Sequence, residues 1–492
     1  MQLSSPSAFH EFSVLNSSFM AKRDIAFLSI SELARLFRMR KLSPVELTKH
    51  LLARVERLNP ELNAFLTVTA DVALKQAHQA EGELCSPRGK KSRRDRGPLQ
   101  GIPISLKDNI HKGGIRTTAG AKFLNDFVPG QDAAIVAKLE AAGAILLGKS
   151  NLHEFAYGVT TNNPHYGPTR NPWDTARIPG GSSGGAAAAV AAGLCVAAIG
   201  TDTGGSIRIP ASLCGIVGFK PTLHRVSAEG IVPLSVTLDC AGPLARSVED
   251  AALVLDAIAA PRKNELSFAK SIAAGSKTKF TLGIPKEFFF DVLSSEVRTN
   301  FEANLKLLCR RGFIAKEISI PLLNHTESAG NNIAWAEATR YHQKMDWFPK
   351  RSADYGEDVR SRLEIGARVT AISYLEALEQ REAFIAQFHS ALADAKVDAL
   401  VVPTTPVAAP LIGEESTIID GKDHATRALL LRLNRPANLA GLPAISLPCG
   451  VSPSGLPLGL QLIAAHSKDS LLLSLSQALA RFLPSVGTPE NA

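Results

Sequence analysis

Two short segments rich in glycine and serine hold the residues best suited to nucleophilic chemistry. One is Pro179-Gly-Gly-Ser-Ser-Gly-Gly, and the other is Gly200-Thr-Asp-Thr-Gly-Gly-Ser-Ile-Arg. Glycines beside a serine leave room for a substrate carbonyl and let backbone N–H groups turn toward a developing oxyanion. A flexible linker, the alternative, does not account for a second Gly-Gly-Ser so soon after the first. The candidate oxyanion donors are the backbone amides of Thr203, Gly204, Gly205 and Ser206.

A serine nucleophile needs a base, and the sequence offers a lysine for this role. No histidine lies close to either segment. Lys107 ends an apolar stretch, residues 102–106, that is typical of a buried strand. Burial without a carboxylate partner lowers the pKa of a lysine toward neutrality. Asp108 follows directly, but adjacent side chains on a strand point to opposite faces, so Asp108 need not pair with Lys107. The alternative is a lysine exposed to solvent at the strand end.

A match to the phosphate-binding loop occurs at Gly143-Ala-Ile-Leu-Leu-Gly-Lys-Ser. That loop needs a strand before its first glycine and a helix from its lysine onward. Here a helical pattern precedes Gly143, and the apolar residues after it favour a strand. We therefore expect no nucleotide site at this position.

A second match, Gly180-Gly-Ser-Ser-Gly, fits the nucleophile elbow of α/β-hydrolases. An elbow follows an apolar strand directly. The residues before Gly180 have turn chemistry instead, with prolines at 172 and 179. The sequence leaves open a Ser-His-Asp set completed by His224, His325 or His342 but does not favour it.

Helical and strand patterns alternate through the chain. Residues 30–80 favour helices, residues 133–142 favour a helix, and residues 186–194, almost all tiny, favour a helix buried on all sides. Short apolar strands are expected at residues 144–147, 281–285, 399–403 and 444–448. This alternation predicts the α/β class: a single large domain with a mostly parallel central mixed sheet covered by helices.

Within this architecture the sequence predicts several regions. Residues 1–24 are expected to form a disordered extension and residues 25–490 the domain itself. Inside the domain we expect N-terminal helices at 30–80, a basic surface loop at 86–98, a catalytic core at 99–250 and a substrate-entrance region at about 330–435.

The net charge of +8 does not point to a nucleic-acid partner. Most of the excess lies in residues 88–96, where basic side chains face the single acidic Asp95. The stretch is bracketed by Pro and Gly and lacks apolar periodicity, so it favours a solvated loop over an RNA contact or localisation signal. We expect no direct binding of nucleic acid.

Other bulk features exclude further classes. No apolar run is long enough to cross a membrane, and the N-terminus lacks the parts of a signal peptide. We therefore expect a cytoplasmic protein with no membrane partner. The cysteines lie far apart without a CxxC pair, which favours reduced, mostly buried thiols and offers no zinc site. We expect no metal and no cofactor. The cysteines are Cys85, Cys195, Cys214, Cys240, Cys309 and Cys449.

From about residue 65 to residue 250, and more weakly to residue 465, the sequence resembles the amidase signature family. The matching segments are Gly101-Ile-Pro-Ile-Ser-Leu-Lys-Asp-Asn, Pro179-Gly-Gly-Ser-Ser-Gly-Gly, Gly200-Thr-Asp-Thr-Gly-Gly-Ser-Ile-Arg-Ile-Pro-Ala and Cys214-Gly-Ile-Val-Gly-Phe-Lys-Pro-Thr. Each segment alone is weak evidence, but four in this order are specific.

The resemblance implies a role for each matching residue. Ser206 is the nucleophile, Ser182, beside a cis peptide, is the bridging serine, and Lys107 is the base. Lys107 takes a proton from Ser182, which takes one from Ser206, and the chain reverses to protonate the leaving amine. Water then hydrolyses the acyl-enzyme. The residues implied to support the loop by hydrogen bonding are Ser183, Asp202 and Arg208.

The resemblance extends to the glutaminase subunit of the tRNA-dependent amidotransferase. Recognition of glutamine needs a cation for its carboxylate and an anion for its ammonium. Arg362 roughly matches a carboxylate-binding arginine, but the acidic residue expected about five positions before Pro436 is absent. We therefore favour a stand-alone amidase acting on a small-molecule amide. The alternative is the glutaminase subunit, with amidotransferase partner subunits.

Other questions stay open at the level of sequence. A catalytically silent binding protein is disfavoured by the intact Lys107, Ser182 and Ser206. Aromatic side chains in the entrance region are candidates for an acyl pocket, but a place in the core explains them equally well. They are Trp335, Tyr341, Trp347 and Phe348. The sequence does not decide the acyl group, an esterase activity or whether the chain forms a homodimer.

Overall fold

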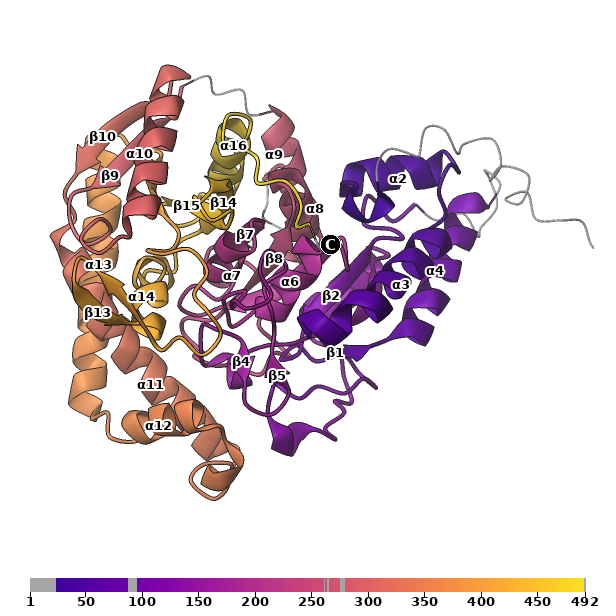
Figure 1. Cartoon of the computed structure of the whole chain (residues 1–492), viewed down its shortest axis with the longest axis horizontal. Coiled ribbons are helices and arrows are strands. Elements are labelled where there is room, and N and C mark those ends of the chain that lie inside the picture. The colour runs from indigo at the N-terminus through magenta and orange to yellow at the C-terminus, as the bar shows by residue number, and fades with distance from the viewer. Residues whose placement is uncertain (1–23, 87–94, 261, 263–264, 275–278, 491–492) are drawn as a thin grey trace, which may run out of the picture.

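The computed structural model describes residues 24–86, 95–260, 262, 265–274 and 279–490 (Figure 1). The predicted N-terminal extension, apart from Asp24, and most of the predicted basic loop therefore lie outside the described residues. Within the described part of the chain, no helix is both long and apolar enough to cross a membrane.

Within the described residues, eleven strands form one central sheet. In spatial order they are β1 (Phe65–Val68), β3 (Ile145–Ser150), β2 (Pro103–Lys107), β6 (Ala197–Asp202), β8 (Cys240–Ala245), β7 (Val217–Lys220), β14 (Ala444–Val451), β15 (Pro457–Ala464), β11 (Ala399–Pro403), β9 (Thr281–Pro285) and β10 (Ile314–Ile318). Two small antiparallel pairs lie outside it: β4 (Asn162–Asn163) with β5 (Gly167–Pro168), and β12 (Ser416–Ile419) with β13 (Lys422–Ala425).

The predicted α/β class and mixed sheet are confirmed, but the expectation of mostly parallel strands is wrong. Parallel pairing among the described strands is confined to β3–β2–β6 and β11–β9–β10. The six other neighbouring pairs, including every pair from β6 to β11 across the centre of the sheet, are antiparallel. The reason is physical: buried parallel and antiparallel strands carry similar apolar runs, so the pattern of one strand does not identify its partner.

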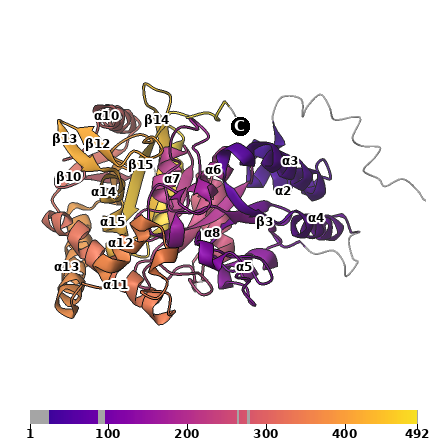
Figure 2. The same ribbon diagram turned by 60° about the horizontal axis from the view of Figure 1, so that its bottom comes forward.

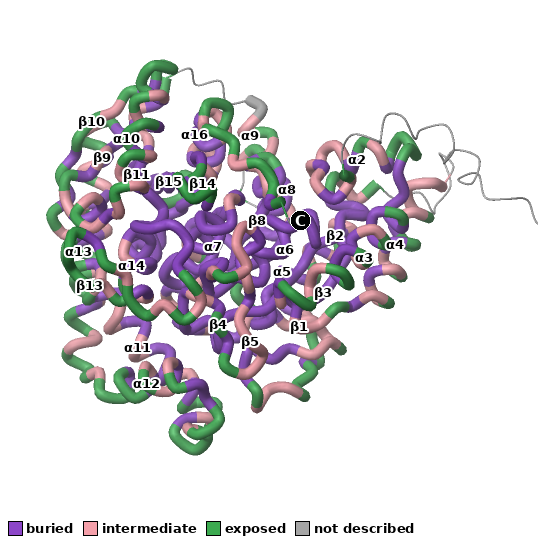
Figure 3. The backbone as a smooth tube through the Cα atoms, viewed as in Figure 1, coloured by how far each residue is buried: buried purple, intermediate pink, exposed green. Residues whose placement is uncertain are grey.

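Helices cover both faces of the sheet. Strands β2, β6, β8 and β15 are buried along their whole length, which requires cover on both sides (Figure 3). Helices α6 (Gly184–Ala191) and α7 (Arg208–Leu213) contact each other and pack on β6 and on β7, β14 and β15. Helices α8 (Val248–Ile258) and α16 (Asp469–Ala480) form a second group, with α9 (Phe268–Ala274), against β6–β8 and β14–β15 (Figure 1). Figure 2 shows α6 and α7 side by side in the middle of the molecule.

The remaining helices flank this centre. They are α2 (Ile30–Arg38), α3 (Pro44–Leu62), α4 (Ala70–Cys85), α5 (Ala134–Ala141), α10 (Ser295–Arg310), α11 (Thr326–Lys344), α12 (Glu357–Gly366), α13 (Ala371–Ala395), α14 (Thr426–Arg432) and α15 (Arg435–Leu439). Figure 1 shows α2–α4 at one end of the molecule and α10–α13 at the other.

Local signals explain where several helices begin. Ser29 and Glu32 form a capping box at α2, and Ser43 caps α3 ahead of Pro44. All eight residues of α6 are buried, as predicted. Gly185 lets the helix approach the backbone of Ala64 and Asn151, and Gly184 leaves room for the Thr161 side chain. The strand β1 inside residues 30–80 was not predicted, because its four residues fall between two helical patterns.

All six cysteines lie in the described part of the chain, and each is a free thiol. Four of them are buried, Cys85 is partly buried and Cys309 is exposed. The prediction of unpaired, mostly buried cysteines is therefore confirmed.

Candidate active site

The parallel pair β2–β6 places two polar strand ends side by side. Leu106 of β2 pairs with Ile199 of β6, so Lys107 at the end of β2 lies level with the last residues of β6. The carboxyl ends of parallel strands share one edge of a sheet, where ligands commonly bind. The segment after β6 carries Ser206 and leads into α7, and Ser182 and Ser183 lead into α6.

Lys107 is buried without a carboxylate in contact. Its Nζ lies 2.6 Å from Ser182 Oγ and 2.7 Å from Thr201 Oγ1. The side chain is 0% exposed, and this burial lowers the pKa of Lys107 to about 7, against the opposing charges of Asp239 and Asp202. At neutral pH a lysine with this pKa is neutral in about half of the molecules and can then accept a proton. The alternative of a solvent-exposed lysine is excluded.

Asp108 is engaged elsewhere, as strand alternation predicted. Its carboxylate accepts from Lys149 Nζ at 2.8 Å, and from the Thr118 backbone N–H at 2.9 Å and hydroxyl at 2.5 Å. Lys149 donates a further bond to Thr117 Oγ1 at 2.8 Å. Lys149 therefore pairs with Asp108, the acidic residue next to Lys107 in the sequence, and Lys107 is left without a carboxylate partner.

Ser206 lies in a cavity and is tied to the bridging segment. The Ser183 backbone N–H donates to the Ser206 carbonyl at 3.2 Å. Ser206 is 5% exposed, and its hydroxyl makes no hydrogen bond among the described residues. The peptide between Gly181 and Ser182 is cis, which the family resemblance implied. The structure thus brings Lys107 and Ser182 into contact and fixes Ser183, the next residue, against Ser206.

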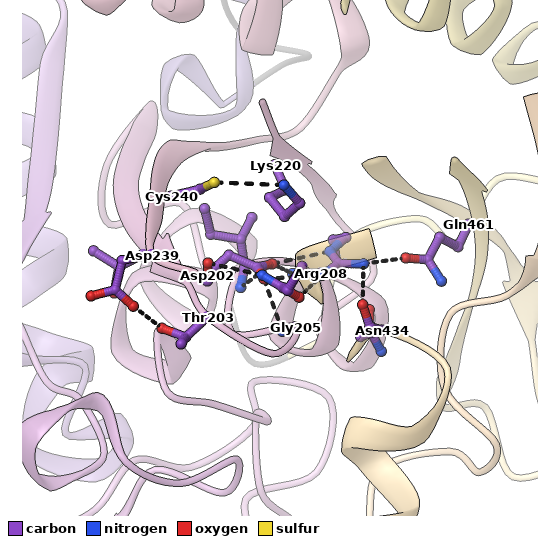
Figure 4. A network of polar contacts seen from close by, with 12 residues as sticks. Asp202, Thr203, Gly205, Arg208, Lys220, Asp239, Cys240, Asn434 and Gln461 are labelled. Carbon is purple, nitrogen blue, oxygen red and sulfur yellow. Dashed lines mark hydrogen bonds and ion pairs between the residues drawn. The ribbon is translucent and has the colours of Figure 1, made fainter. Parts of the chain in front are cut away.

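Asp202 and Arg208 form the support of the loop between β6 and α7 (Figure 4). Both are 0% exposed and their ion pair measures 3.0 Å. Asp202 also accepts from the backbone N–H groups of Gly205 at 2.8 Å and Ile207 at 3.1 Å. Arg208 donates to the Asn434 carbonyl at 3.0 Å, Gln461 Oε1 at 2.5 Å and Asn438 Oδ1 at 2.6 Å. The Ser183 hydroxyl donates to the Thr201 carbonyl at 3.2 Å.

The oxyanion prediction needs one correction. The Gly205 N–H donates to Asp202, so it is withdrawn from any substrate oxygen, and Gly205 serves the loop instead. Its φ of +124° is one that side chains rarely adopt, and a Cβ there would lie 2.6 Å from Asn434 Cβ. The backbone N–H groups of Thr203, Gly204 and Ser206 have no hydrogen-bond partner among the described residues and stay available.

The cavity at Ser206 is small, with a volume of about 20 Å³. Its lining is Ala156, Tyr157, Gly158, Val159, Thr203, Gly204, Ser206, Leu234, Ala334, Arg427, Leu431 and Arg435. Four of these lie in the predicted entrance region, but none is one of the four aromatic residues considered for an acyl pocket. Those aromatics pack instead with Phe123, Phe155 and Tyr355 in an apolar cluster. This cluster shares Tyr157 and Leu234 with the cavity wall.

The two rejected motif matches behave as the sequence predicted. Residues 145–150 form strand β3 after helix α5, so the lysine of the phosphate-loop match does not open a helix. No strand among the described residues runs directly into Gly180. The three histidines also fail to complete a triad, since none hydrogen-bonds Ser182 or Ser206. His342, for example, is buried and bonds the Tyr355 hydroxyl at 2.8 Å.

Several site residues were missed at the level of sequence. Thr201 contacts Lys107, and Asp239 accepts from the Thr203 hydroxyl. Burial raises the pKa of Asp239 to about 6, although its hydrogen bonds to Thr203, Leu234 and Ser235 favour the anion. Strand alternation from Asp202 was a usable signal for Thr201. No sequence signal identified the cavity residues of α14 and α15, more than 200 positions beyond Ser206.

The residues weighed for glutamine recognition are also placed. Leu431, five positions before Pro436, lines the cavity where an acidic residue was expected. Arg362 is engaged by this chain itself: it pairs with Asp358 at 2.8 Å and donates to the Tyr157 carbonyl.

Comparisons with known proteins complete the description. The family model described as Amidase matches residues 46–473. The chain is 40% identical over 479 residues to the A subunit of glutamyl-tRNA(Gln) amidotransferase from Hahella chejuensis, covering 91% of this chain and 95% of that protein. A crystal structure of an amidase shares 34% identity at a TM-score of 0.83, over 93% of this chain and 100% of that one. The crystal structure of the corresponding amidotransferase protein from Thermotoga maritima shares 35% identity at a TM-score of 0.76, over 95% and 99%.

Proposed function

This chain belongs to the amidase family, and from that premise we propose that it hydrolyses a small carboxylic acid amide through an acyl-enzyme on Ser206. Family membership makes it a hydrolase of C–N amide bonds. The residues that perform the reaction, its substrate and its partners are the parts that we propose.

The contact between Lys107 and Ser182 supports the following mechanism. Lys107, neutral near pH 7, accepts the proton of Ser182, and Ser182 accepts that of Ser206 as the Ser206 oxygen attacks the amide carbonyl. The free backbone N–H groups of Thr203, Gly204 and Ser206 are suited to stabilise the oxyanion. The relay then runs in reverse to protonate the leaving amine, and water hydrolyses the acyl-enzyme.

One observation carries this proposal. A completely buried lysine, without a carboxylate in contact, lies 2.6 Å from the hydroxyl of Ser182. A structural lysine in such a place is normally paired, as Lys149 is with Asp108. The unpaired state of Lys107 keeps its pKa low, which a base requires and a purely structural role does not.

A second candidate is the glutaminase subunit of a tRNA-dependent amidotransferase. It is supported by 40% identity to a protein named as a component of such an enzyme. The cavity argues against it, because Leu431 replaces an anion for the ammonium of glutamine. We therefore propose a stand-alone amidase acting on a small-molecule amide, in the cytoplasm. Partner subunits belong to the second candidate, and a homodimer stays an open prediction.

The test is ammonia release by the purified single chain, with Ser206→Ala as the control. Turnover of propionamide- or benzamide-type substrates that is lost in Ser206→Ala supports the stand-alone amidase. Silence until a tRNA-binding partner is added, followed by turnover of glutamine, supports the second candidate. Activity that survives Ser206→Ala contradicts the catalytic assignment.

A further inference from the structure

Two arginines in the wall of the Ser206 cavity have no hydrogen-bond or ion-pair partner among the described residues. Arg427 of α14 and Arg435 of α15 both line the cavity, and Arg435 is only 4% exposed. Neither forms a hydrogen bond or an ion pair with any described residue, and the Nε of each is buried without an acceptor. A buried guanidinium without a counter-charge is costly to the fold, so its presence calls for a reason.

The electrostatics of the wall agree with this geometry. Burial lowers the pKa of Arg427 to about 9, with further repulsion from Arg362 and Arg435. Burial also lowers the pKa of Arg435 to about 10, against the opposing charge of Glu327, which lies beyond ion-pair distance. The hydroxyl of Tyr157, another lining residue, is also buried without a partner. The cavity therefore presents unsatisfied donors and positive charge but no acidic residue among those that line it.

Two neighbouring arginines, Arg432 and Arg362, do contact carboxylates. Arg432 of α14 lies over the Phe288 ring at 4.0 Å and contacts Asp291 at 3.3 Å and Glu327 at 3.7 Å. Arg362 pairs with Asp358. Among the described arginines of α12, α14 and α15, the two that face the cavity are therefore the ones without a partner.

Arg435 lies close to the reacting groups. A Cβ built on Gly204 would be 3.6 Å from an Nη of Arg435, and Gly204 supplies one of the free backbone N–H groups beside Ser206. The stem of Arg435 packs against Gly330 of α11, where a Cβ would approach its Cδ to 2.6 Å. An anionic group bound by this arginine would therefore lie only a few bonds from the amide carbonyl under attack.

We propose that the acyl part of the substrate carries a carboxylate, bound by Arg427 and Arg435, and carries no amino group. This inference rests on the proposed function, since it places the amide at Ser206. The substrate class is then the monoamides of short dicarboxylic acids. Arginine suits a carboxylate through paired N–H donors, the Tyr157 hydroxyl adds a third donor, and the two cations disfavour an ammonium.

The first test compares matched substrates. Malonamate, succinamate and glutaramate are each assayed against the corresponding neutral diamide, and the last two also against L-asparagine and L-glutamine, which add only an α-amino group. We expect the best monoamide to exceed its diamide by at least about tenfold in kcat/KM, and its amino-acid counterpart by a similar factor. Equal or better turnover of the diamide, or of glutamine over glutaramate, would overturn the inference.

The second test assigns the preference to the two arginines. Arg435→Gln and Arg427→Gln are each expected to lower the ratio of monoamide to diamide kcat/KM about tenfold or more, mainly through KM. Arg435→Lys should restore part of that ratio because it keeps the charge. Arg432→Gln, on the same segment but paired outside the cavity, is the matched control and should leave the ratio unchanged. An unchanged ratio in both cavity variants would overturn the inference.

The two proposals fail in different ways. Turnover of neutral amides without preference for monoamides contradicts the inference alone. Hydrolysis of no amide at all contradicts the proposed function, and binding then tests the inference by itself. Calorimetry with glutarate and succinate should show tighter binding to the wild-type chain than to Arg435→Gln, and equal binding would overturn the inference.

Discussion

The buried and partly buried cations around Ser206 fall into two regions with opposite environments. In the support region, formed by Asp108, Lys149, Asp202 and Arg208, each cation contacts a carboxylate that is equally buried. In the reactive region, formed by Lys107, Arg427 and Arg435, no cation has a carboxylate within contact among the described residues.

The difference separates charges that hold the structure from charges kept for a ligand. A paired buried cation has its charge satisfied in the folded state, so losing it leaves an unpaired carboxylate behind. An unpaired cation destabilises the fold and is maintained for chemistry or binding. Changes in the reactive region should therefore reduce activity more than stability, and changes in the support region should do the reverse.

The largest expected effect is the loss of the base. Lys107→Met should lower kcat/KM by roughly 10²–10⁴-fold, because the hydroxyl relay from Ser206 then has no acceptor. The free energy of unfolding should stay within about 1 kcal/mol of the wild type, since no ion pair is lost. Ammonia release and urea unfolding of the same preparation measure the two quantities. Lys41→Met, at an exposed position, is the control. A variant that keeps most of its activity contradicts the role of Lys107.

The second effect is on folding. Arg208→Met leaves the fully buried Asp202 without its cation and should lower the free energy of unfolding by about 3–5 kcal/mol. Urea or thermal unfolding measures this loss. A loss below about 1 kcal/mol would show that the support region does not differ from the reactive region.

Sequence reasoning was accurate where it depended on local geometry. Alternation along a strand predicted that Asp108 would turn away from Lys107, and the small residues of α6 predicted its complete burial. It did not identify Lys149 as the partner of Asp108, because pairing between β2 and β3 is a property of the folded sheet. It likewise missed Arg427 and Arg435, which reach Ser206 only through long-range packing of α14 and α15.

A third change tests the loop that the support region holds. Gly205→Ala introduces a Cβ at a φ of +124° and within 2.6 Å of Asn434, and should cost roughly 1–3 kcal/mol of stability, with reduced activity. Gly312→Ala is the matched control, because its φ is +95° but no atom lies within 4 Å of the new Cβ. The excess loss in Gly205→Ala over this control, measured by urea unfolding, reports the contact with Asn434. Equal losses of stability in the two variants would mean that the loop between β6 and α7 shifts to accommodate the new Cβ.

The pH profile tests the low pKa in the reactive region. Since Lys107 must be neutral to accept a proton and its pKa is about 7, kcat/KM should rise with pH to about 7 and then level off. Below that value it should fall by about tenfold per pH unit. Asp239→Asn removes an anion that raises the pKa of Lys107, so it should move the acid limb to lower pH. An acid limb that stays at the same pH in Asp239→Asn would mean that a group other than Lys107 determines the pH profile.

The pH dependence of the free energy of unfolding should also reflect the lowered pKa of Lys107. Between about pH 7 and 10.5 the unfolded chain keeps a proton on Lys107 that the folded chain has released. The free energy of unfolding of the wild type, relative to Lys107→Met, should therefore increase as pH rises through this range. Urea unfolding at pH 7, 8.5 and 10 measures it, and a relative decrease would contradict the depressed pKa.

The smallest expected effect on stability is that of Arg435→Met, and it tests the difference between the two regions most directly. Arg435→Met removes a cation almost as enclosed as Arg208, yet it breaks no ion pair within the described part of the protein. Its free energy of unfolding should change by no more than about 1 kcal/mol, or increase, because an unpaired charge leaves the interior while the apolar stem against Gly330 is kept. A loss as large as that of Arg208→Met would mean that Arg435 holds the structure, and the two regions would then no longer differ. A neutral or stabilising result, together with a lost preference for monoamides, would mean that the charge serves a ligand.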